Sequence, residues 1–295
     1  MRIFVTGSSS HLAQSLLPRL CEDPAVTGIT GVDLAPPQFA HAKFVAHRLD
    51  VRSPRIAALL AGHDALVHLA FVVLRRRMSE AEMFDINVRG SHRVFQAARS
   101  LGVVRLLHMS SAAVYGSGVH LDEDAPLAPL PGFLYAQHKM HLEQLLAIEF
   151  PDCVRLRPHI VLGPHAHPLL RQLLNQPCYL RLPDPQPLLQ CVHEDDVARA
   201  VLLCLVKPVG GAFNLAVEDN FTFRDAIRGR RRLRVPLPPA VARGVLNLAW
   251  RWTGWGGEPA WIDGVSRTLL VNCRRIRVEL GWRSSFSAAK VLAQT

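Results

Sequence analysis

The alternation of short apolar runs with helical patterns is the feature that most constrains the fold of this chain. Strand-like apolar runs begin near residues 2, 29, 44, 65, 103 and 153, and helical patterns occupy stretches between them. Strands that alternate with helices form a parallel sheet with helices on both faces. Such strands are buried on both sides, which explains why the runs are continuously apolar. The sequence therefore predicts an α/β fold, a doubly wound parallel-sheet Rossmann fold.

The expected elements divide the chain into two parts. Strands are expected at 2–5, 29–33, 44–48, 65–69, 103–109, 153–156 and 212–215, and helices at 11–21, 80–100, 135–149 and 195–206. After residue 158 prolines cluster, and from residue 241 the chain is rich in helical pattern. We therefore expect a Rossmann domain over residues 1–158 and a small, mostly helical substrate-binding lobe over 159–295. Segments near 189–216 are expected to return to the first domain.

The charge of the chain is uneven. Of the net charge of +10, residues 1–150 contribute +1 (14 Lys+Arg, 13 Asp+Glu) and residues 151–295 contribute +9 (20 and 11). A basic half suits an anionic ligand. No nucleic-acid module is recognisable, no apolar run approaches the roughly 18–20 residues that span a bilayer, and no signal-peptide pattern is present. We expect an anionic small-molecule substrate, no nucleic-acid or membrane partner, and a cytoplasmic protein.

A turn of small residues follows the first expected strand. In the dinucleotide fingerprint, the first glycine makes the tight turn, the second admits the pyrophosphate and the third allows close helix packing. Here Gly7, Ser10 and Ala13 hold these three places. A plain strand–helix turn is the alternative interpretation. The expected cofactor contacts of this turn are Gly7, Ser9, Ser10, His11 and Leu12.

Acidic residues end the next two strands. Asp33 ends the second strand, where a carboxylate can hydrogen-bond the adenosine ribose. It also repels a 2′-phosphate, and no arginine follows it, so NAD is expected rather than NADP. Asp50 and Val51 close the third strand and are expected to border the adenine. The alternative for Asp50 is a capping or loop acid before Ser53 and Pro54.

Three residues form a candidate catalytic set. Tyr135 and Lys139 are four residues apart at the start of an expected helix, which puts both on one helix face. An ammonium beside a phenol lowers a pKa that starts near ~10, as a tyrosine acid or base requires. Ser111 follows an apolar strand, at the edge where open α/β sheets bind ligands. It is predicted to hydrogen-bond the reacting oxygen.

Two further groups of residues allow more than one interpretation. His159, His165 and His167 are close in sequence, but no carboxylate or cysteine completes a metal-ligand spacing. We expect them to be pocket or surface histidines, and we expect no metal. For the C-terminal tryptophans we favour the core of the lobe or a rim over the substrate cleft; a membrane-surface helix is the alternative. These are Trp250, Trp252, Trp255 and Trp261.

Several landmarks follow one another in a fixed order. They are Val5-Thr6-Gly7, Asp33, Asp50-Val51-Arg52, Leu66 to Ala70, Asn87 to Ser91, Ser110 to Gly116, Tyr135 to Lys139, Arg157-Pro158, Gly163-Pro164, His193 to Ala198, Phe213 to Ala216, and Glu279 to Trp282. In this order the chain resembles the extended short-chain dehydrogenases/reductases, in their NAD-dependent epimerase/dehydratase branch. It is most similar to a short bacterial subgroup that is UDP-glucose 4-epimerase-like.

The resemblance implies a role for each residue of the set. Tyr135 is the catalytic acid or base, and Lys139 lowers its pKa and contacts the nicotinamide ribose. Ser111 polarises the substrate oxygen. Asn87 holds the geometry of the active-site helix or lies near the cofactor. The further cofactor contacts implied by position are Leu69, Ala70, Asn87, Tyr135, Lys139 and Pro158.

The resemblance leaves the substrate open. Only 28 residues separate Pro164 from His193, and they lack the Gly-Asp-Gly-like stretch with which nucleotide-sugar epimerases contact their substrate. The main expectation is an epimerase or dehydratase of an activated sugar. The alternatives are a reductase or dehydrogenase of a small or apolar alcohol or carbonyl, and a non-catalytic dinucleotide sensor. The resemblance also implies a homodimer formed through the helices at 80–100 and 135–149.

Overall fold

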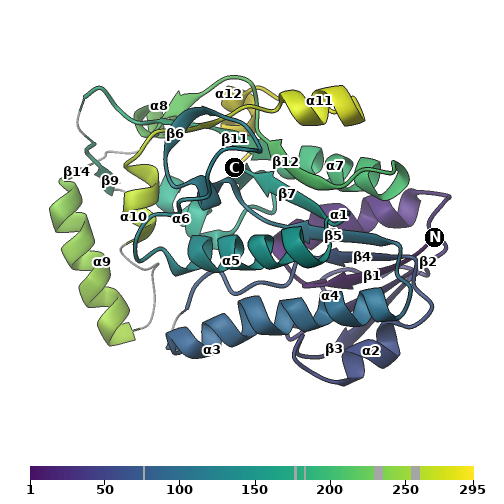
Figure 1. The fold of residues 1–295 in the computed structure, drawn as a ribbon. Coiled ribbons are helices and arrows are strands. Elements are labelled where there is room, and N and C mark those ends of the chain that lie inside the picture. Colours follow the sequence, from purple (N-terminus) through teal and green to yellow (C-terminus); the bar gives the residue numbers. More distant parts are fainter. Residues whose placement is uncertain (76, 176–177, 183, 229–234, 254–259) are drawn as a thin grey trace.

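A seven-stranded parallel sheet forms the centre of the molecule (Figure 1). A computed structural model describes residues 1–295 except 76, 176–177, 183, 229–234 and 254–259. The strand order is β12-β7-β5-β4-β1-β2-β3. Strands β1 to β3 are added toward one edge of the sheet and the later strands toward the other, so the topological switch point lies between β1 and β4. The strands are β1 (Arg2–Thr6), β2 (Gly28–Asp33), β3 (Phe44–Arg48), β4 (Ala65–His68), β5 (Arg105–Met109), β7 (Val154–Pro158) and β12 (Gly211–Leu215).

Helices cover both faces of this sheet, as the apolar runs predicted. Ile3 and Val5 of β1 face one layer, and Phe4 between them faces the other. The first layer contains α1 (His11–Glu22), α7 (Glu194–Val206) and α11 (Arg274–Leu280). The second contains α2 (Arg55–Leu60), α4 (Ser91–Ser100) and α5 (Leu134–Glu149). The predicted fold class is therefore confirmed.

The expected helix at 80–100 is interrupted. It consists of α3 (Glu80–Phe84), a π-helix (Asp85–Gly90) and α4. A π-helical turn often accompanies a side chain with a specific task, because the wider turn changes where that side chain points. Here the π-helical turn carries Asn87, whose contacts are described below. Helical periodicity in the sequence does not distinguish such a turn from the α-helix around it.

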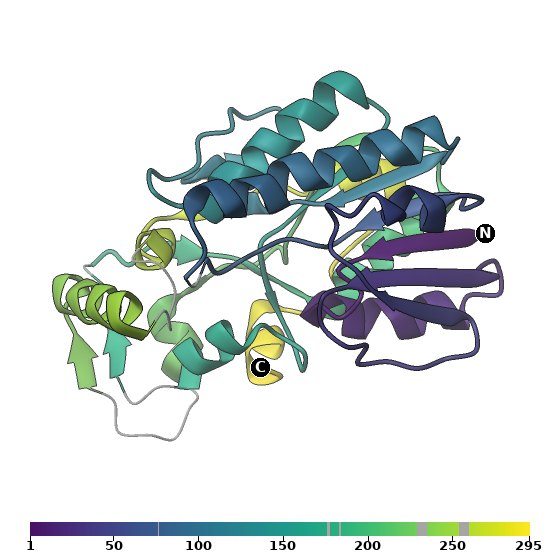
Figure 2. The same ribbon diagram turned by 90° about the horizontal axis from the view of Figure 1, so that it is seen from below.

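The C-terminal part contains short strands as well as helices. Its two-stranded pairs are β8 (Ile160–Leu162) with β11 (Cys191–His193), β10 (Leu188–Leu189) with β13 (Phe221–Thr222), β9 (Cys178–Leu180) with β14 (Val235–Leu237), and β15 (Leu269–Val271) with β6 (Gly118–Leu121). Its other helices are α6 (Pro168–Asn175), α8 (Phe223–Arg228), α9 (Pro239–Thr253), α10 (Ala260–Val265) and α12 (Ala288–Ala293). Figure 2 shows this lobe beside the sheet, away from the N-terminus.

The chain returns from the lobe to the sheet after residue 190. The helix α7 packs on α1, and β12 pairs with β7 as an edge strand. By contrast, β11 pairs with β8 outside the main sheet. Of the two segments expected to return, the one near 212–215 therefore enters the sheet, and the one near 189–192 does not. The division of the chain at residue 158 stays a prediction.

Candidate active site

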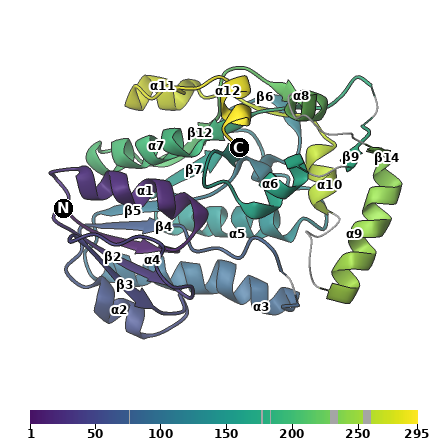
Figure 3. The same cartoon turned by 180° about the vertical axis from the view of Figure 1, so that it is seen from behind.

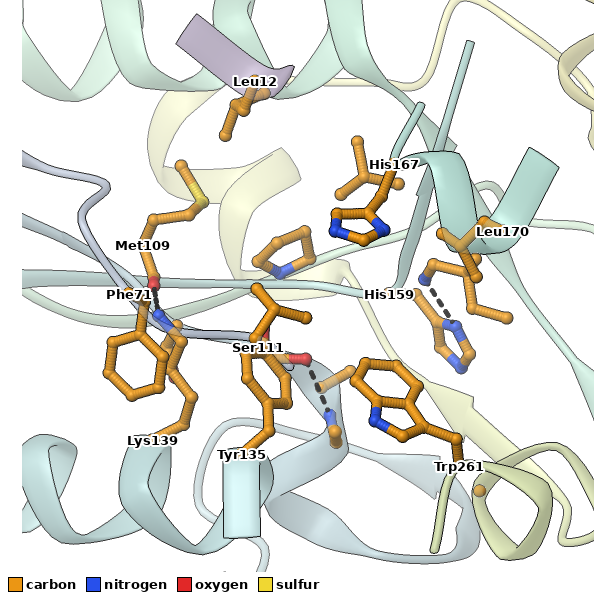
Figure 4. Close-up of a pocket in the computed structure, with 18 of the residues that line it drawn as sticks. Leu12, Phe71, Met109, Ser111, Tyr135, Lys139, His159, His167, Leu170 and Trp261 are labelled. Carbon is orange, nitrogen blue, oxygen red and sulfur yellow. Dashed lines mark hydrogen bonds between the residues drawn. The ribbon is translucent and has the colours of Figure 1, made fainter. Parts of the chain in front are cut away.

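A cavity of about 310 Å³ lies where the carboxyl ends of the sheet strands meet the lobe (Figure 4). Its walls come from the β1–α1 turn, the segments after β4, β5 and β7, the first two turns of α5, and the helices α6 and α10. Most of the lining is apolar. Its polar side chains are Ser10, His11, Ser110, Ser111, Tyr135, Lys139, His159, His165, His167 and Glu194.

The β1–α1 turn is shaped for close backbone approach. Gly7 has φ +71°, and a Cβ there would lie 2.5 Å from the backbone nitrogen of Ala70. Ser10 caps α1, because its Oγ accepts from the backbone N–H of Ala13. The first-turn amides of His11 and Leu12 have no acceptor within the helix by its geometry, and both residues line the cavity. This turn fits the pyrophosphate of a dinucleotide.

The two acidic residues have different environments. Asp33 Oδ2 accepts from the backbone N–H of Ser9 at 2.9 Å, so the carboxylate is held beside the turn, where it fits a ribose. Asp50 instead binds the guanidinium of Arg52 at 2.8 Å, which lowers the pKa of the carboxyl. Val51 packs partly buried against the core on the second face of the sheet. Neither Asp50 nor Val51 lines the cavity, and their contact with an adenine stays a prediction.

Ser111, Tyr135 and Lys139 lie in the same cavity, as Figure 4 shows. Ser111 ends the segment after β5, and its Oγ accepts from the backbone N–H of Ala113 at 3.2 Å. Tyr135 lies in the first turn of α5, and Lys139 one turn later. Burial raises the pKa of the Tyr135 hydroxyl to about 12, and a hydrogen bond with Ser111 acts in the opposite direction.

Lys139 is bound to groups other than the Tyr135 hydroxyl in this structure. Its Nζ donates to the carbonyl of Met109, lies 3.5 Å from the ring centre of Phe71 and 5.8 Å from that of Tyr135. Burial moves the pKa of Lys139 well below its ordinary value, and the nearby carboxylate of Glu143 opposes this. Spacing along a helix predicted the neighbourhood correctly. It contains no information on the carbonyl and the aromatic ring that hold the ammonium.

A buried ion pair between Glu143 and Arg157 lies next to the candidate catalytic residues. Glu143 lies one turn after Lys139 on α5 and is 1% exposed. It binds both Nε and Nη2 of Arg157, at 3.0 and 2.6 Å, and accepts from the hydroxyl of Ser110. This pair ties α5 to β7 and to the segment after β5. Sequence reasoning missed Glu143, although its spacing of four from Lys139 was a signal.

Asn87 holds the segment after β4. Its Oδ1 accepts from the backbone N–H of Val72 at 2.7 Å, and its Nδ2 donates to the carbonyl of the same residue at 2.9 Å. Nδ2 is also 3.5 Å from Nδ1 of His138 on α5. Asn87 is fully buried and outside the cavity lining. It therefore positions the segment that carries Phe71, and its proximity to the cofactor stays a prediction.

The substrate side of the cavity is aromatic. Trp261 of α10 lies with its ring centre 5.8 Å from that of Tyr135 and 4.8 Å from that of Phe133. Figure 4 shows the Trp261 ring beside Tyr135. Trp261 thus lies in the cavity wall, and its position over a substrate stays a prediction, whereas Trp252 is 79% exposed and lies outside the lobe core. The Trp250 side chain and Trp255 lie outside the described part of the chain.

The histidines of the lobe lie in the cavity wall, one of the two positions expected. His159, His165 and His167 all contribute to the lining. His165 Nδ1 lies 2.7 Å from Oε1 of the buried Glu194. Burial lowers the pKa of His159 to about 4 and also lowers the pKa of His11, so both rings are neutral near pH 7. Among the described residues, no group of three or more His, Cys, Asp or Glu is arranged to hold a metal ion.

A family model matches most of the chain. The model for the NAD dependent epimerase/dehydratase family matches residues 3–216. The chain belongs to this family. The resemblance read from the ordered landmarks is therefore confirmed, and NAD, expected from Asp33, is the cofactor that the description of the family names.

Two relatives illustrate the range of the family. An uncharacterized protein of Mycobacterium tuberculosis (strain H37Rv) is 26% identical over 309 residues, which cover 98% of this chain and 81% of that protein. The 4-hydroxy-2-methyl-3-oxo-4-farnesyl-3,4-dihydroquinoline-1-oxide ketoreductase of Stigmatella aurantiaca is 31% identical over 192 residues. That match covers 59% of this chain and 54% of the ketoreductase.

Solved structures share the fold. The UDP-glucuronic acid 4-epimerase of Bacillus cereus, in complex with UDP-glucuronic acid and NAD, superposes with a TM-score of 0.78 at 19% identity. The superposition covers 100% of this chain and 97% of the epimerase. None of the helices in the described part of the chain has the length and hydropathy of a transmembrane segment.

Proposed function

We propose that this protein is an NAD-dependent dehydrogenase or reductase that interconverts an alcohol and a carbonyl on an apolar substrate. The observation that carries the proposal is the cavity lining. Among the described residues it contains no arginine and a single lysine, Lys139, which is bound to the carbonyl of Met109. His11 and His159 are neutral near pH 7. A nucleotide diphosphate would therefore find few cationic partners there.

The residues present fit NAD, which supplies the hydride acceptor or donor when bound. The amides of His11 and Leu12 would bind the pyrophosphate, and the carboxylate of Asp33 the adenosine ribose. A 2′-phosphate would meet that carboxylate, which supports NAD over NADP. Lys139 would contact the nicotinamide ribose, because it lines the same cavity as His11 and Leu12.

Ser111, Tyr135 and Lys139 together would transfer one proton to or from the substrate oxygen. Tyr135 Oη takes the proton of the substrate alcohol during oxidation and returns it to the carbonyl oxygen during reduction. Ser111 Oγ donates to the same oxygen and holds it beside Tyr135. The ammonium of Lys139 stabilises the phenolate as it forms. Phe133 and Trp261 exclude water from the reacting oxygen.

A second candidate is an epimerase of a nucleotide sugar. Its support is the fold shared with a UDP-glucuronic acid 4-epimerase that was solved in complex with UDP-glucuronic acid and NAD. The Stigmatella ketoreductase supports the first candidate, since its name describes reduction of a farnesylated ring ketone.

One assay separates the two candidates. The purified protein is incubated with NAD and either hydroxysteroids and prenylated alcohols or UDP-glucose, and NADH is followed by its absorbance. We expect NADH to accumulate with an apolar alcohol, in proportion to the carbonyl formed. Conversion of UDP-glucose to UDP-galactose without net NADH would instead establish the epimerase.

A further inference from the structure

The side chain of Lys139 is buried without a carboxylate bound to it. Lys139 is 3% exposed, and in the described part of the chain it forms no ion pair. An ammonium has three N–H donors, and the carbonyl of Met109 is the one hydrogen-bond acceptor that the described residues offer it. Burial of this kind favours the neutral amine over the ammonium. The charge that the proposed mechanism needs on Lys139 therefore requires a further source of stabilisation.

The carboxylate nearest to Lys139 along α5 is already bound to other groups. Glu143 binds Nε and Nη2 of Arg157 and accepts from the hydroxyl of Ser110. Nε of Arg155 on β7 lies 4.0 Å from the same carboxylate. Glu143 raises the pKa of Lys139, but its negative charge is shared with two guanidinium groups. It therefore compensates the ammonium only in part.

The sheet beneath α5 adds no negative charge. The helix α5 packs on the face of the sheet that includes β4 and β5 (Figure 3). His68 of β4 and His108 of β5 are fully buried on this side, and the charge of Lys139 contributes to lowering the pKa of both rings. Burial lowers the pKa of His68 to about 3 and that of His108 well below 6.5, so both are neutral near pH 7. Burial also keeps the hydroxyl of Tyr135 protonated, with its pKa raised to about 12.

The face of an aromatic ring lies against the ammonium instead. Nζ of Lys139 is 3.5 Å from the ring centre of Phe71, compared with 5.8 Å from that of Tyr135. Figure 4 shows the ring of Phe71 beside the Lys139 side chain. The face of a phenyl ring carries partial negative charge, and its attraction for a cation is strongest where water is excluded. Phe71 therefore supplies the stabilisation that the ion pairs and the histidines do not.

The ring of Phe71 is held in this position. Asn87 of the π-helical turn binds the backbone N–H and carbonyl of Val72, the next residue in the chain. The ring packs against the apolar core on this face of the sheet. It also meets the ring of Tyr135 edge to face, with centres 5.7 Å apart and an angle of 89°. One side chain thus contacts both the ammonium and the phenol of the candidate catalytic set.

We propose that Phe71 is a positioning residue whose ring face keeps the side chain of Lys139 charged and fixed beside Tyr135. Its consequence for catalysis rests on the proposed function, in which the ammonium stabilises the phenolate of Tyr135. A leucine in place of Phe71 would fill much of the same space but would offer no negative face. The amine of Lys139 would then lose its proton at a lower pH, and the phenolate would lose the charge that stabilises it.

The protonation of Lys139 is measured directly by NMR. The chain contains four lysines, at positions 43, 139, 207 and 290, so a protein labelled with carbon-13 at the lysine Cε gives few signals. The full chain, without cofactor or substrate, is titrated from about pH 6 to about pH 11. The variant Lys139→Met assigns the signal of this residue, and the other three lysines are internal controls.

Three further proteins separate the charge of the ring from its shape. Phe71→Leu removes the ring. Replacement of Phe71 by a trifluorinated phenylalanine keeps the shape of the ring and withdraws the negative charge from its face. Phe133→Leu is the matched control, because it removes a ring of the same cavity that contacts Tyr135 and Trp261. Melting temperatures confirm that each protein is folded.

We expect the titration midpoint of Lys139 to fall by about one pH unit in Phe71→Leu and in the fluorinated protein. The midpoint should stay unchanged in Phe133→Leu. An unchanged midpoint in both proteins altered at position 71 overturns the proposal. A fall in Phe71→Leu alone also overturns it, because the ring would then act by filling space. So does a Lys139 that is already neutral at about pH 6 in the unchanged protein.

A kinetic measurement connects the ring to the proposed function. With NAD and an apolar alcohol, Phe71→Leu should lower kcat about tenfold and leave KM nearly unchanged. The acid side of its pH profile should move to higher pH, because the phenolate of Tyr135 forms less readily without the ammonium. The lysine titration needs no turnover. A protein that oxidises no alcohol therefore contradicts the proposed function and leaves the titration result standing.

Discussion

The sheet and the lobe build their two sides of the cavity from different parts of the chain. On the sheet side, the β1–α1 turn presents mainly backbone groups. They are Gly7 in a left-handed conformation, the capped end of α1 and the amides of the first turn of α1. On the lobe side, the wall consists of side chains such as Trp261 and Leu170 on short helices. A binding site made of backbone groups, here called the backbone cradle (Gly7 and the first turn of α1), suits a ligand that does not change within a fold family. A wall made of side chains can instead be altered by single substitutions, and so suits a ligand that changes.

The two sides also differ in how their polar groups are satisfied. Near the sheet, Asn87, Glu143 and Arg157 are buried and bound to partners on other elements, so the catalytic segments are held in place. On the lobe side, the ring of Trp261 packs against Phe133 at the start of α5, and this aromatic contact sets shape more than orientation. We therefore expect substitutions on the sheet side to affect chemistry and cofactor, and substitutions in the lobe to affect substrate.

The largest effect is expected at the chemical step. Tyr135→Phe removes the hydroxyl that moves the proton, so kcat should fall by about 10²–10⁴ while the Kd for NADH changes little. Steady-state kinetics and fluorescence titration with NADH measure the two quantities. Tyr179→Phe, the same change on β9 outside the cavity lining, is the control. Unchanged turnover in Tyr135→Phe would remove the catalytic assignment of Tyr135.

The backbone cradle is tested by Gly7→Ala. The new Cβ would lie 2.5 Å from the backbone of Ala70, and φ is +71°. We expect a loss of about 2–3 kcal/mol in the free energy of unfolding, together with weaker NADH binding.

The matched control for the cradle is Gly102→Ala. Its φ is +77°, and no atom lies within 4 Å of the new Cβ. This variant has the unfavourable backbone conformation without the steric clash. Its free energy of unfolding should fall by about 1 kcal/mol, and it should bind NADH as the unchanged protein does. Urea unfolding and NADH titration of both variants measure how much the close approach to Ala70 contributes to stability and to cofactor binding. Equal losses in the two proteins would mean that the close approach to Ala70 contributes nothing.

The lobe wall is tested by Trp261→Ala. Loss of a large aromatic contact should raise KM for an apolar alcohol by roughly 10–50-fold, with the Kd for NADH unchanged. Trp252→Ala, which removes the same side chain from a position 79% exposed, should leave KM unchanged for a substrate in solution. If Trp261→Ala also raised the Kd for NADH, the lobe side of the cavity would bind the cofactor as well. The contrast between the sheet side and the lobe side would then be lost.

The last expected effect is on acid stability. Burial lowers the pKa of His68 to about 3 and moves that of His108 well below the ordinary 6.5. Below pH 6.5 the unfolded chain binds protons that the folded chain does not. The free energy of unfolding should therefore fall as pH decreases from 6.5 toward 4, by at most about 1.4 kcal/mol per pH unit for each ring.

His108 offers the variant for this effect. Neither of its ring nitrogens has a hydrogen-bond partner among the described residues, whereas His68 binds Thr6 and Ser91. His108→Leu should therefore reduce the slope of stability against pH without leaving polar groups unpaired. Urea unfolding at pH 5 and pH 7 measures the slope, and identical slopes in the variant and the unchanged protein would contradict this assignment.

Local sequence patterns predicted much of the sheet side. Each expected strand has a counterpart within about two residues at its ends, because buried parallel strands are continuous apolar runs between turn residues. Gly7, Asp33 and the pair Tyr135 and Lys139 were predicted from their spacing and their places along the chain, since a turn, a strand end and a helix face are short-range features. The ordered landmarks then identified the family.

Only the tertiary structure decided the electrostatics and the substrate wall. The carbonyl of Met109 and the ring of Phe71 that hold Lys139 lie about 30 and 70 residues away from it in the chain, so no local spacing indicates them. The same is true of Trp261, which meets Tyr135 across 126 residues. The sequence predicted helical structure from residue 241, but whether the apolar side chains of α9 are covered depends on what packs against them. Burial and long-range contact are properties of the whole fold. For this reason the sequence determined the scaffold and the candidate catalytic residues, and the tertiary structure determined their environment.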